Sequence, residues 1–131
     1  MELLALRPHI EHLSYDKALT HEAFQNTTLR AILKYQHPLT RALLDTDPLF
    51  AKRFPQSSQL SLEAYAEAVD THVKSHKEIR ALIIGMVIGM MTTSEYAEYC
   101  LHKAEYNRRI ITMQIKRYVD SRPSVNYRQG S

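Results

Sequence analysis

The stretch SHKEIRALIIGMVIGMMTTSEYAEY, residues 75–99, decides the fold that the sequence predicts. It contains the longest apolar run of the chain and two of its three glycines. A helix start signal stands on each side of that run, because Ser75 with Glu78 and Thr92 with Glu95 both match the S/T-x-x-E capping box. The stretch therefore predicts a short apolar helix, a tight corner near Thr92, and then a longer helix.

The apolar run, residues 81–91, is too short to cross a bilayer, which takes about 20 residues. A helix that is apolar on all sides must be covered on all sides, so we expect it at the centre of the fold. Gly85 and Gly89 are four residues apart and share one face, which lets another helix approach closely. That face packs either within the monomer or across a two-fold axis.

Apolar residues recur at helical spacing in the rest of the chain as well. Such stripes occupy residues 3–13, 24–43, 62–73 and 93–122. Proline removes a backbone donor and clashes with the preceding turn, so Pro38 predicts a kink or break in the second stripe. No strand alternation is present, and the pattern predicts an all-α protein, a compact bundle of about five helices.

Prolines and polar residues predict where the chain leaves the helices. Asp47-Pro48 and Phe54-Pro55 flank a segment expected to be irregular, and residues 55–61 (PQSSQLS) are expected to form a loop. The length of 131 residues fits one domain. We expect residues 1–122 to form a single helical domain and residues 123–131 to be a flexible tail.

Composition and charge favour a cytoplasmic protein. The single Cys100 cannot form an internal disulfide, and Glu2 with Arg7-Pro8 does not fit a signal peptide. Residues 103–131 carry seven basic and two acidic residues, but helices favour cations near their C-termini, and no aromatic stacking platform accompanies them. We expect no nucleic-acid or membrane partner. Eight tyrosines are typical of interfaces and agree with a homodimer.

Seven histidines raise the question of a metal site. His72 and His76 have the i, i+4 spacing that presents two nitrogens to one ion, and Glu98 and His102 share that spacing. There is no H-E-x-x-H motif and no pair of Glu-x-x-His units. No set of three ligands converges by spacing alone, so the sequence predicts no metal site and no cofactor, with His72 and His76 the weak candidates.

Asn107 lies in the middle of the last apolar stripe, with Arg108 on its flank. A buried amide must be hydrogen-bonded, so Asn107 is interpreted first as a packing contact. The alternative is a pocket in which Arg30, Asn107 and Arg108 bind a small anionic ligand. Cys100 falls on the same stripe and is expected to be a buried, unreactive thiol. No catalytic residue is predicted.

Three strings are familiar together: EAFQNTTLRAILKYQ (22–36), KEIRALIIGMVIGMMTTSEYAEY (77–99) and YNRRIITMQIKRY (106–118). With them the chain resembles a family of small helical proteins from Bacteroidetes genomes. Members of that family sometimes carry the label "glyoxalase", but this sequence has neither the strands nor the His-x-His-x-Asp-His motif of the glyoxalase types. The resemblance implies a helical fold and assigns no role to any residue.

Two functional classes remain open from the sequence. The first is a non-catalytic helical protein that acts through self-association and protein contacts, with Gly85 and Gly89 at the interface. The second is a small-molecule or metal-binding protein, or an enzyme, with a polar site between helices. That site is expected near Asn107 and Arg108 or near His72 and His76.

Overall fold

The computed structural model describes residues 21–122, and their regular structure is entirely helical, without a strand. The elements follow one another as α2 (His21–Ala23), the π-helical turn η2 (Phe24–Leu29), α3 (Arg30–Asp45), α4 (Pro48–Arg53), the 3₁₀ turn η3 (Ser57–Gln59), α5 (Leu62–Ser75), α6 (Lys77–Ile88), α7 (Thr93–Leu101) and α8 (Lys103–Asp120). The predicted all-α class is confirmed. The predicted helix within residues 3–13 and the tail at 123–131 lie outside the described residues.

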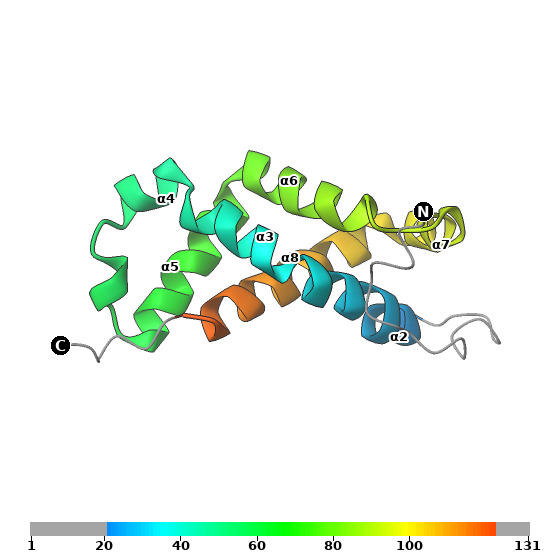
Figure 1. Cartoon of the computed structure of the whole chain (residues 1–131), viewed down its shortest axis with the longest axis horizontal. Helices are drawn as coiled ribbons and strands as arrows, with labels where there is room; N and C mark the ends of the chain where they lie inside the picture. The colour runs from blue at the N-terminus through cyan, green and yellow to red at the C-terminus, as the bar shows by residue number, and fades with distance from the viewer. Residues whose placement is uncertain (1–20, 123–131) are drawn as a thin grey trace.

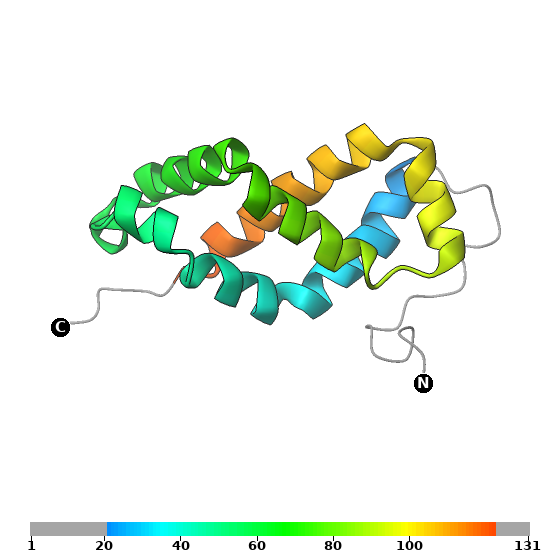
Figure 2. The ribbon, with the colours of Figure 1, turned by 90° about the horizontal axis from the view of Figure 1, so that it is seen from above.

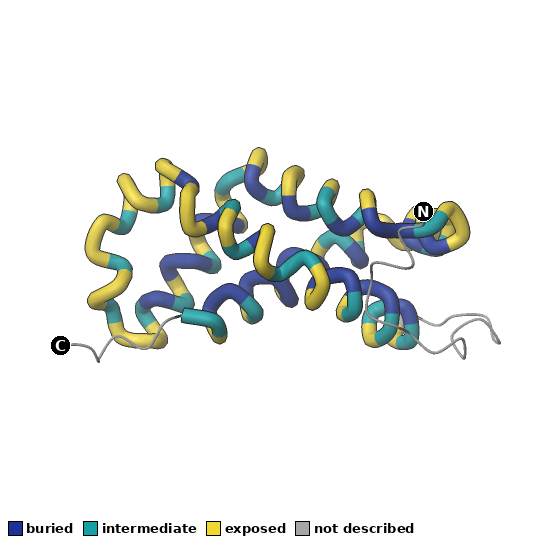
Figure 3. The backbone as a smooth tube through the Cα atoms, in the orientation of Figure 1, coloured by how far each residue is buried: buried dark blue, intermediate teal, exposed yellow. Residues whose placement is uncertain are grey.

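Helix α8 is the element on which the others pack. It contacts α3, α5 and α6, and it crosses behind α3 in Figure 1 and beneath α6 in Figure 2. Figure 3 shows one buried stripe along nearly all of α8. The fully or nearly fully buried side chains of this core include Phe24, Leu33, Val69, Ile83, Tyr106 and Ile110.

The apolar helix α6 is covered on one face only by the described residues. Ile79, Ile83 and Val87 are buried, whereas Leu82 is 52% exposed and Gly85 is also exposed. Within residues 21–122 the expectation of cover on all sides is not met, because α6 contacts α3, α5 and α8 while its buried side chains are spaced four residues apart on one face. No helix among the described residues is long and apolar enough to cross a membrane.

Prolines lie inside α3 and at the start of α4, where the sequence predicted a kink or break and an irregular segment. Helix α3 continues through Pro38 without a break, because Pro38 and Lys34 are both exposed and water can reach the carbonyl that loses its donor. The segment expected to be irregular forms α4 instead. Asp47 caps this helix and Pro48 occupies its first turn, where the missing amide donor is not needed.

The two predicted capping boxes have different outcomes. At Thr92 both reciprocal bonds are present, since Thr92 N donates to Glu95 Oε1 at 2.9 Å and Glu95 N donates to Thr92 Oγ1 at 3.1 Å. At Ser75 the box does not form. Ser75 is the last residue of α5, its hydroxyl donates to the His72 carbonyl, and His76 separates α5 from α6. The predicted loop at 55–61 contains only the short turn η3, and Arg122 donates to its carbonyls, including that of Ser58 at 2.8 Å.

The last helix was expected to be continuous, but it is divided at His102 into α7 and α8. The division changes which face is buried. Cys100, which was expected to be buried, is exposed together with Leu101, and Tyr99 and Tyr106 are buried instead. The apolar stripe that the sequence predicts for residues 93–122 therefore matches the buried side chains only after the break, from Ile111 onward.

Candidate metal centre

The centre begins with Asp47, which lies between α3 and α4. An aspartate followed by proline is typical of a helix start, because the carboxylate can accept from the first free amides and proline tolerates the first position. Here Asp47 Oδ1 accepts from Leu49 N at 3.1 Å. This bond leaves Oδ2 for other partners, and the side chain of Asp47 is only 4% exposed.

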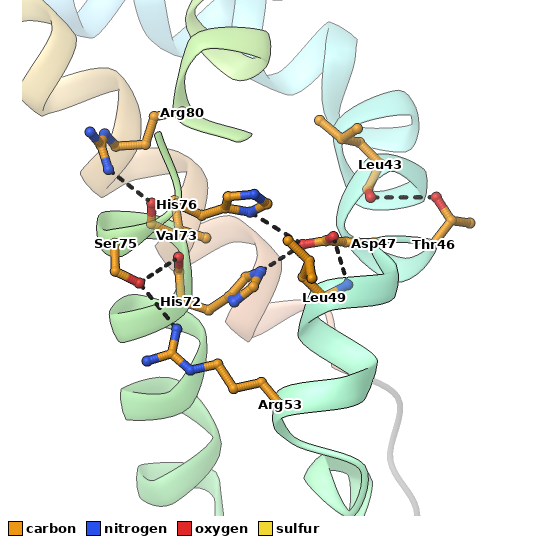
Figure 4. A network of polar contacts seen from close by, with 10 residues as sticks. All are labelled: Leu43, Thr46, Asp47, Leu49, Arg53, His72, Val73, Ser75, His76 and Arg80. Carbon is orange, nitrogen blue, oxygen red and sulfur yellow. Dashed lines mark hydrogen bonds and ion pairs between the residues drawn. The ribbon is translucent and has the colours of Figure 1, made fainter. Parts of the chain in front are cut away.

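His72 and His76 come from the end of α5 and from the break that follows it. His72 lies in the last turn of α5, and His76 has an extended backbone, φ −111° and ψ 92°, between the two helices. The break lies directly beside α4, so both imidazoles reach the carboxylate of Asp47 (Figure 4). Sequence spacing alone put the two histidines on one face, and the fold adds the carboxylate from 25 residues upstream.

The three side chains meet at Asp47 Oδ2. His72 Nε2 lies 2.6 Å from this oxygen and His76 Nδ1 lies 3.7 Å from it. The exposed fractions of the two imidazoles are 3% for His72 and 19% for His76. One potential ligand atom from each residue lies within 4.8 Å of the other two. Among the described residues this is the only group of three or more histidine, cysteine or acidic side chains that is this close.

The imidazoles are packed but not fully hydrogen-bonded. The ring of Phe50 meets the edge of His72 at a centroid distance of 5.1 Å, and the two imidazoles are 5.2 Å apart. Nδ1 of His76 is buried and has no hydrogen-bond partner, since 3.7 Å to Asp47 is too long for one. Buried polar atoms without a partner are uncommon, so this nitrogen is available to a ligand.

A surface pocket of about 400 Å³ opens on the two histidines. Its wall includes Leu49 and the cationic side chains of Lys52 and Arg53 from α4, with Ser75 on the opposite side. Arg53 Nη1 donates to Ser75 Oγ at 3.1 Å and so links α4 to the end of α5 (Figure 4). The pocket gives solvent and small molecules access to one side of the centre.

The other residues singled out from the sequence lie elsewhere. Asn107 is half-buried and accepts a short hydrogen bond from the hydroxyl of Tyr99, which ties α7 to α8. Arg108 is exposed. Arg30 lines a groove together with Arg109, and neither Asn107 nor Arg108 belongs to that lining. The grouping of Arg30, Asn107 and Arg108 around one ligand stays a prediction.

Asp47 is the site residue that sequence reasoning missed. The Asp-Pro pair was treated as a boundary of an irregular segment, and the same pair is a signal for a capped helix that fixes the aspartate in place. Comparison with protein-family models, curated proteins and solved structures finds no match to this chain.

Proposed function

We propose that this protein binds a divalent transition-metal ion through Asp47, His72 and His76. The observation that carries the proposal is the convergence of three potential ligand atoms, all within 4.8 Å, at a buried position next to an open pocket. Two imidazoles and one carboxylate suit zinc and ferrous iron in particular. The sequence pattern alone predicted no metal, because Asp47 lies far from the histidines in the chain.

The distances fit an ion after a small adjustment. Metal–ligand bonds of about 2.0–2.2 Å at a tetrahedral angle separate the ligand atoms by roughly 3.3–3.6 Å. His76 Nδ1 already lies 3.7 Å from Asp47 Oδ2, and the 2.6 Å contact of His72 would lengthen as the ion enters. Bond formation would also give His76 Nδ1 the partner that it lacks.

Three protein ligands favour a site with one open coordination position over a closed structural site. Structural zinc sites have four protein ligands, whereas catalytic sites have three and leave a position for water or substrate. The pocket beside His72 and His76 gives such a position room, and Lys52 and Arg53 in its wall favour an anionic molecule there. A metal bound here could polarise a ligand or lower the pKa of a bound water.

The alternative is a structural contact, in which the buried hydrogen bond between His72 and Asp47 only holds α5 against α4. Zinc binding separates the two readings. We expect calorimetry with Zn²⁺ on chelator-treated protein to show about one equivalent bound. A rise in the melting temperature with Zn²⁺ concentration should accompany it, because a ligand that binds only the native state stabilises it.

Two variants and a matched control make the test specific. His72→Gln and His76→Gln should each lower zinc affinity by at least about tenfold, because each removes a ligand. His102→Gln is the control, because His102, like His76, lies at a break between two helices. Retained zinc affinity in His76→Gln, or equal loss in His102→Gln, would contradict the proposal.

We also propose that a second copy of the chain packs on the exposed face of α6, where Gly85 and Gly89 lie. Apart from the backbone of α6 itself, no atom of residues 21–122 lies within 4 Å of the position that a Cβ on Gly85 would take, so packing among these residues does not require a glycine there. No glycine among the described residues has a positive φ, so the backbone does not require one either. A helical glycine loses about 1 kcal/mol relative to alanine, and close approach of a partner helix would offset that loss.

Light scattering at micromolar concentration tests the association. The wild-type protein is expected to have twice the mass of the chain, and Gly85→Leu to have the monomer mass because the side chain would hold the partner helix away. Ala97→Leu is the control, since it adds the same side chain at an exposed position on α7. A wild-type monomer would contradict the proposal.

A further inference from the structure

A second cavity, independent of the metal centre, lies between α3 and α8 and has a volume of about 620 Å³. The residues that line it are spaced three and four apart on each helix, so each helix presents one face to the cavity. We call this cavity the α3–α8 groove. Its charged and polar lining consists of Arg30, His37, Arg109, Thr112, Lys116, Arg117, Asp120 and Ser121.

The α3–α8 groove has a marked excess of positive charge. Four permanent cations line it against the single carboxylate of Asp120, and that carboxylate pairs with Lys116 at 3.2 Å. Within residues 21–122, no carboxylate pairs with Arg30 or Arg117. Arg109 Nε donates to Gln25 Oε1 at 3.1 Å, which fixes the guanidinium beside the groove.

His37 lies in the wall of the α3–α8 groove, close to its cationic side chains. Burial lowers the pKa of this imidazole, and the nearby cations Arg117 and Arg41 lower it further. Its Nδ1 is buried and has no hydrogen-bond partner. The wall of the groove thus offers unpaired guanidinium groups and a nitrogen without a partner, and no anion among the described residues neutralises them.

We propose that the α3–α8 groove binds a small organic phosphate with two or more negative charges. Guanidinium groups bind phosphate through paired N–H donors, and arginines project from both helices. The side chain of Met113, which keeps 9% of its surface exposed in the same lining, offers an apolar contact to the organic part of such a molecule. The volume lies within the usual range for small-molecule sites, about 300–1,000 Å³.

Calorimetry with fructose 1,6-bisphosphate as the probe tests the proposal. We expect one bisphosphate per chain with a Kd below about 1 mM at roughly 0.15 M salt. Arg30→Met combined with Arg117→Met should weaken binding by at least about tenfold, because it removes one guanidinium from each wall. The control is Lys103→Met with Arg108→Met, which removes the same charge from exposed positions on α8 outside the groove.

Three results would overturn the proposal. They are the absence of saturable binding, equal loss of binding in the control, and equally tight binding of citrate, which would replace phosphate by carboxylate as the preferred group.

A second measurement on the wild-type protein locates the site even where a variant fails to fold. The ring signals of His37, assigned by His37→Gln, should shift in NMR spectra as bisphosphate is added. A shift of the His72 and His76 signals instead would place the anion in the other pocket and contradict the inference.

Discussion

Asp47 makes two kinds of contact with one carboxylate. Oδ1 caps α4 through Leu49 N, and Oδ2 faces His72 and His76. Asp47→Asn separates these roles, because asparagine caps helices as well as aspartate and still offers an oxygen to His72. We expect the free energy of unfolding to change by no more than about 1–2 kcal/mol. Zinc affinity should fall at least about tenfold, because an amide is a weak ligand.

Urea unfolding and zinc calorimetry on the same preparation of Asp47→Asn give both quantities. A variant that loses stability but binds zinc as tightly as the wild type would show that Asp47 is structural only. Asp47→Ala serves as the reference that loses both the cap and the carboxylate.

Gln114 is a buried amide without a hydrogen-bond partner. It lies on α8 with none of its surface exposed, and neither its Nε2 nor its Oε1 has a partner. An unsatisfied buried polar group costs about 1–3 kcal/mol, so Gln114→Met, which keeps the length of the side chain, should stabilise the protein by roughly that amount.

The matched comparison is Gln36, whose Nε2 donates to the Met86 carbonyl at 3.3 Å. Gln36→Met removes this bond and should destabilise the protein by about 0.5–1.5 kcal/mol. Chemical denaturation of both variants checks the pair. The same sign for both changes would contradict this account of Gln114.

At the scale of single residues, the sequence predicted contacts between residues that are close in the chain and missed contacts between distant ones. The box at Thr92 and Glu95 could be predicted because all its atoms lie within one turn. The partner of His72 could not, because Asp47 reaches it only when α4 packs beside α5. Gln114 was missed because one polar residue in an apolar stripe does not reveal whether a partner faces it.

Helix α6 combines an apolar sequence with an exposed glycine face. Gly85 lies in the helix interior with open space around its Cβ position, so alanine fits without a clash. At a protein concentration that favours the monomer, Gly85→Ala should raise the free energy of unfolding by up to about 1 kcal/mol. At a concentration that favours the dimer this gain should shrink, because the added methyl group would hold the partner helix away.

Thermal unfolding over a range of concentrations measures both effects. Gly89→Ala is the comparison at the residue that follows the end of α6, because its Cβ would lie 3.3 Å from the Gly85 carbonyl oxygen and the substitution should gain less. A loss of stability in Gly85→Ala at the lowest concentration would contradict the exposed position of this face.

At the scale of elements, the helices were predictable and several of their ends were not. Apolar periodicity indicated α3, α5 and α8 because each buries one stripe. The break at His102 has no proline or glycine to signal it, so the stripe was extended across it. At Pro38 the sequence allowed for a helix break where α3 is continuous. Pro38 is exposed, so water can reach the carbonyl that has lost its backbone donor, which would not be possible in a core.

At the scale of the whole molecule, the candidate metal centre lies where three elements meet. Asp47 comes from the start of α4, His72 from the end of α5, and His76 from the break before α6 (Figure 4). The core helix α8 makes no contribution to this centre and instead forms one wall of the α3–α8 groove. The resemblance to small helical proteins of Bacteroidetes stays a prediction from sequence strings.

The metal centre is tested most directly by anomalous X-ray diffraction from crystals grown with Zn²⁺ and measured on both sides of the zinc absorption edge. We expect one strong peak per chain within about 2.0–2.2 Å of His72 Nε2, His76 Nδ1 and an oxygen of Asp47. The side of the ion that faces the pocket should carry water or a small molecule. Fully occupied zinc at other residues, or no anomalous peak between these three side chains, would contradict the account.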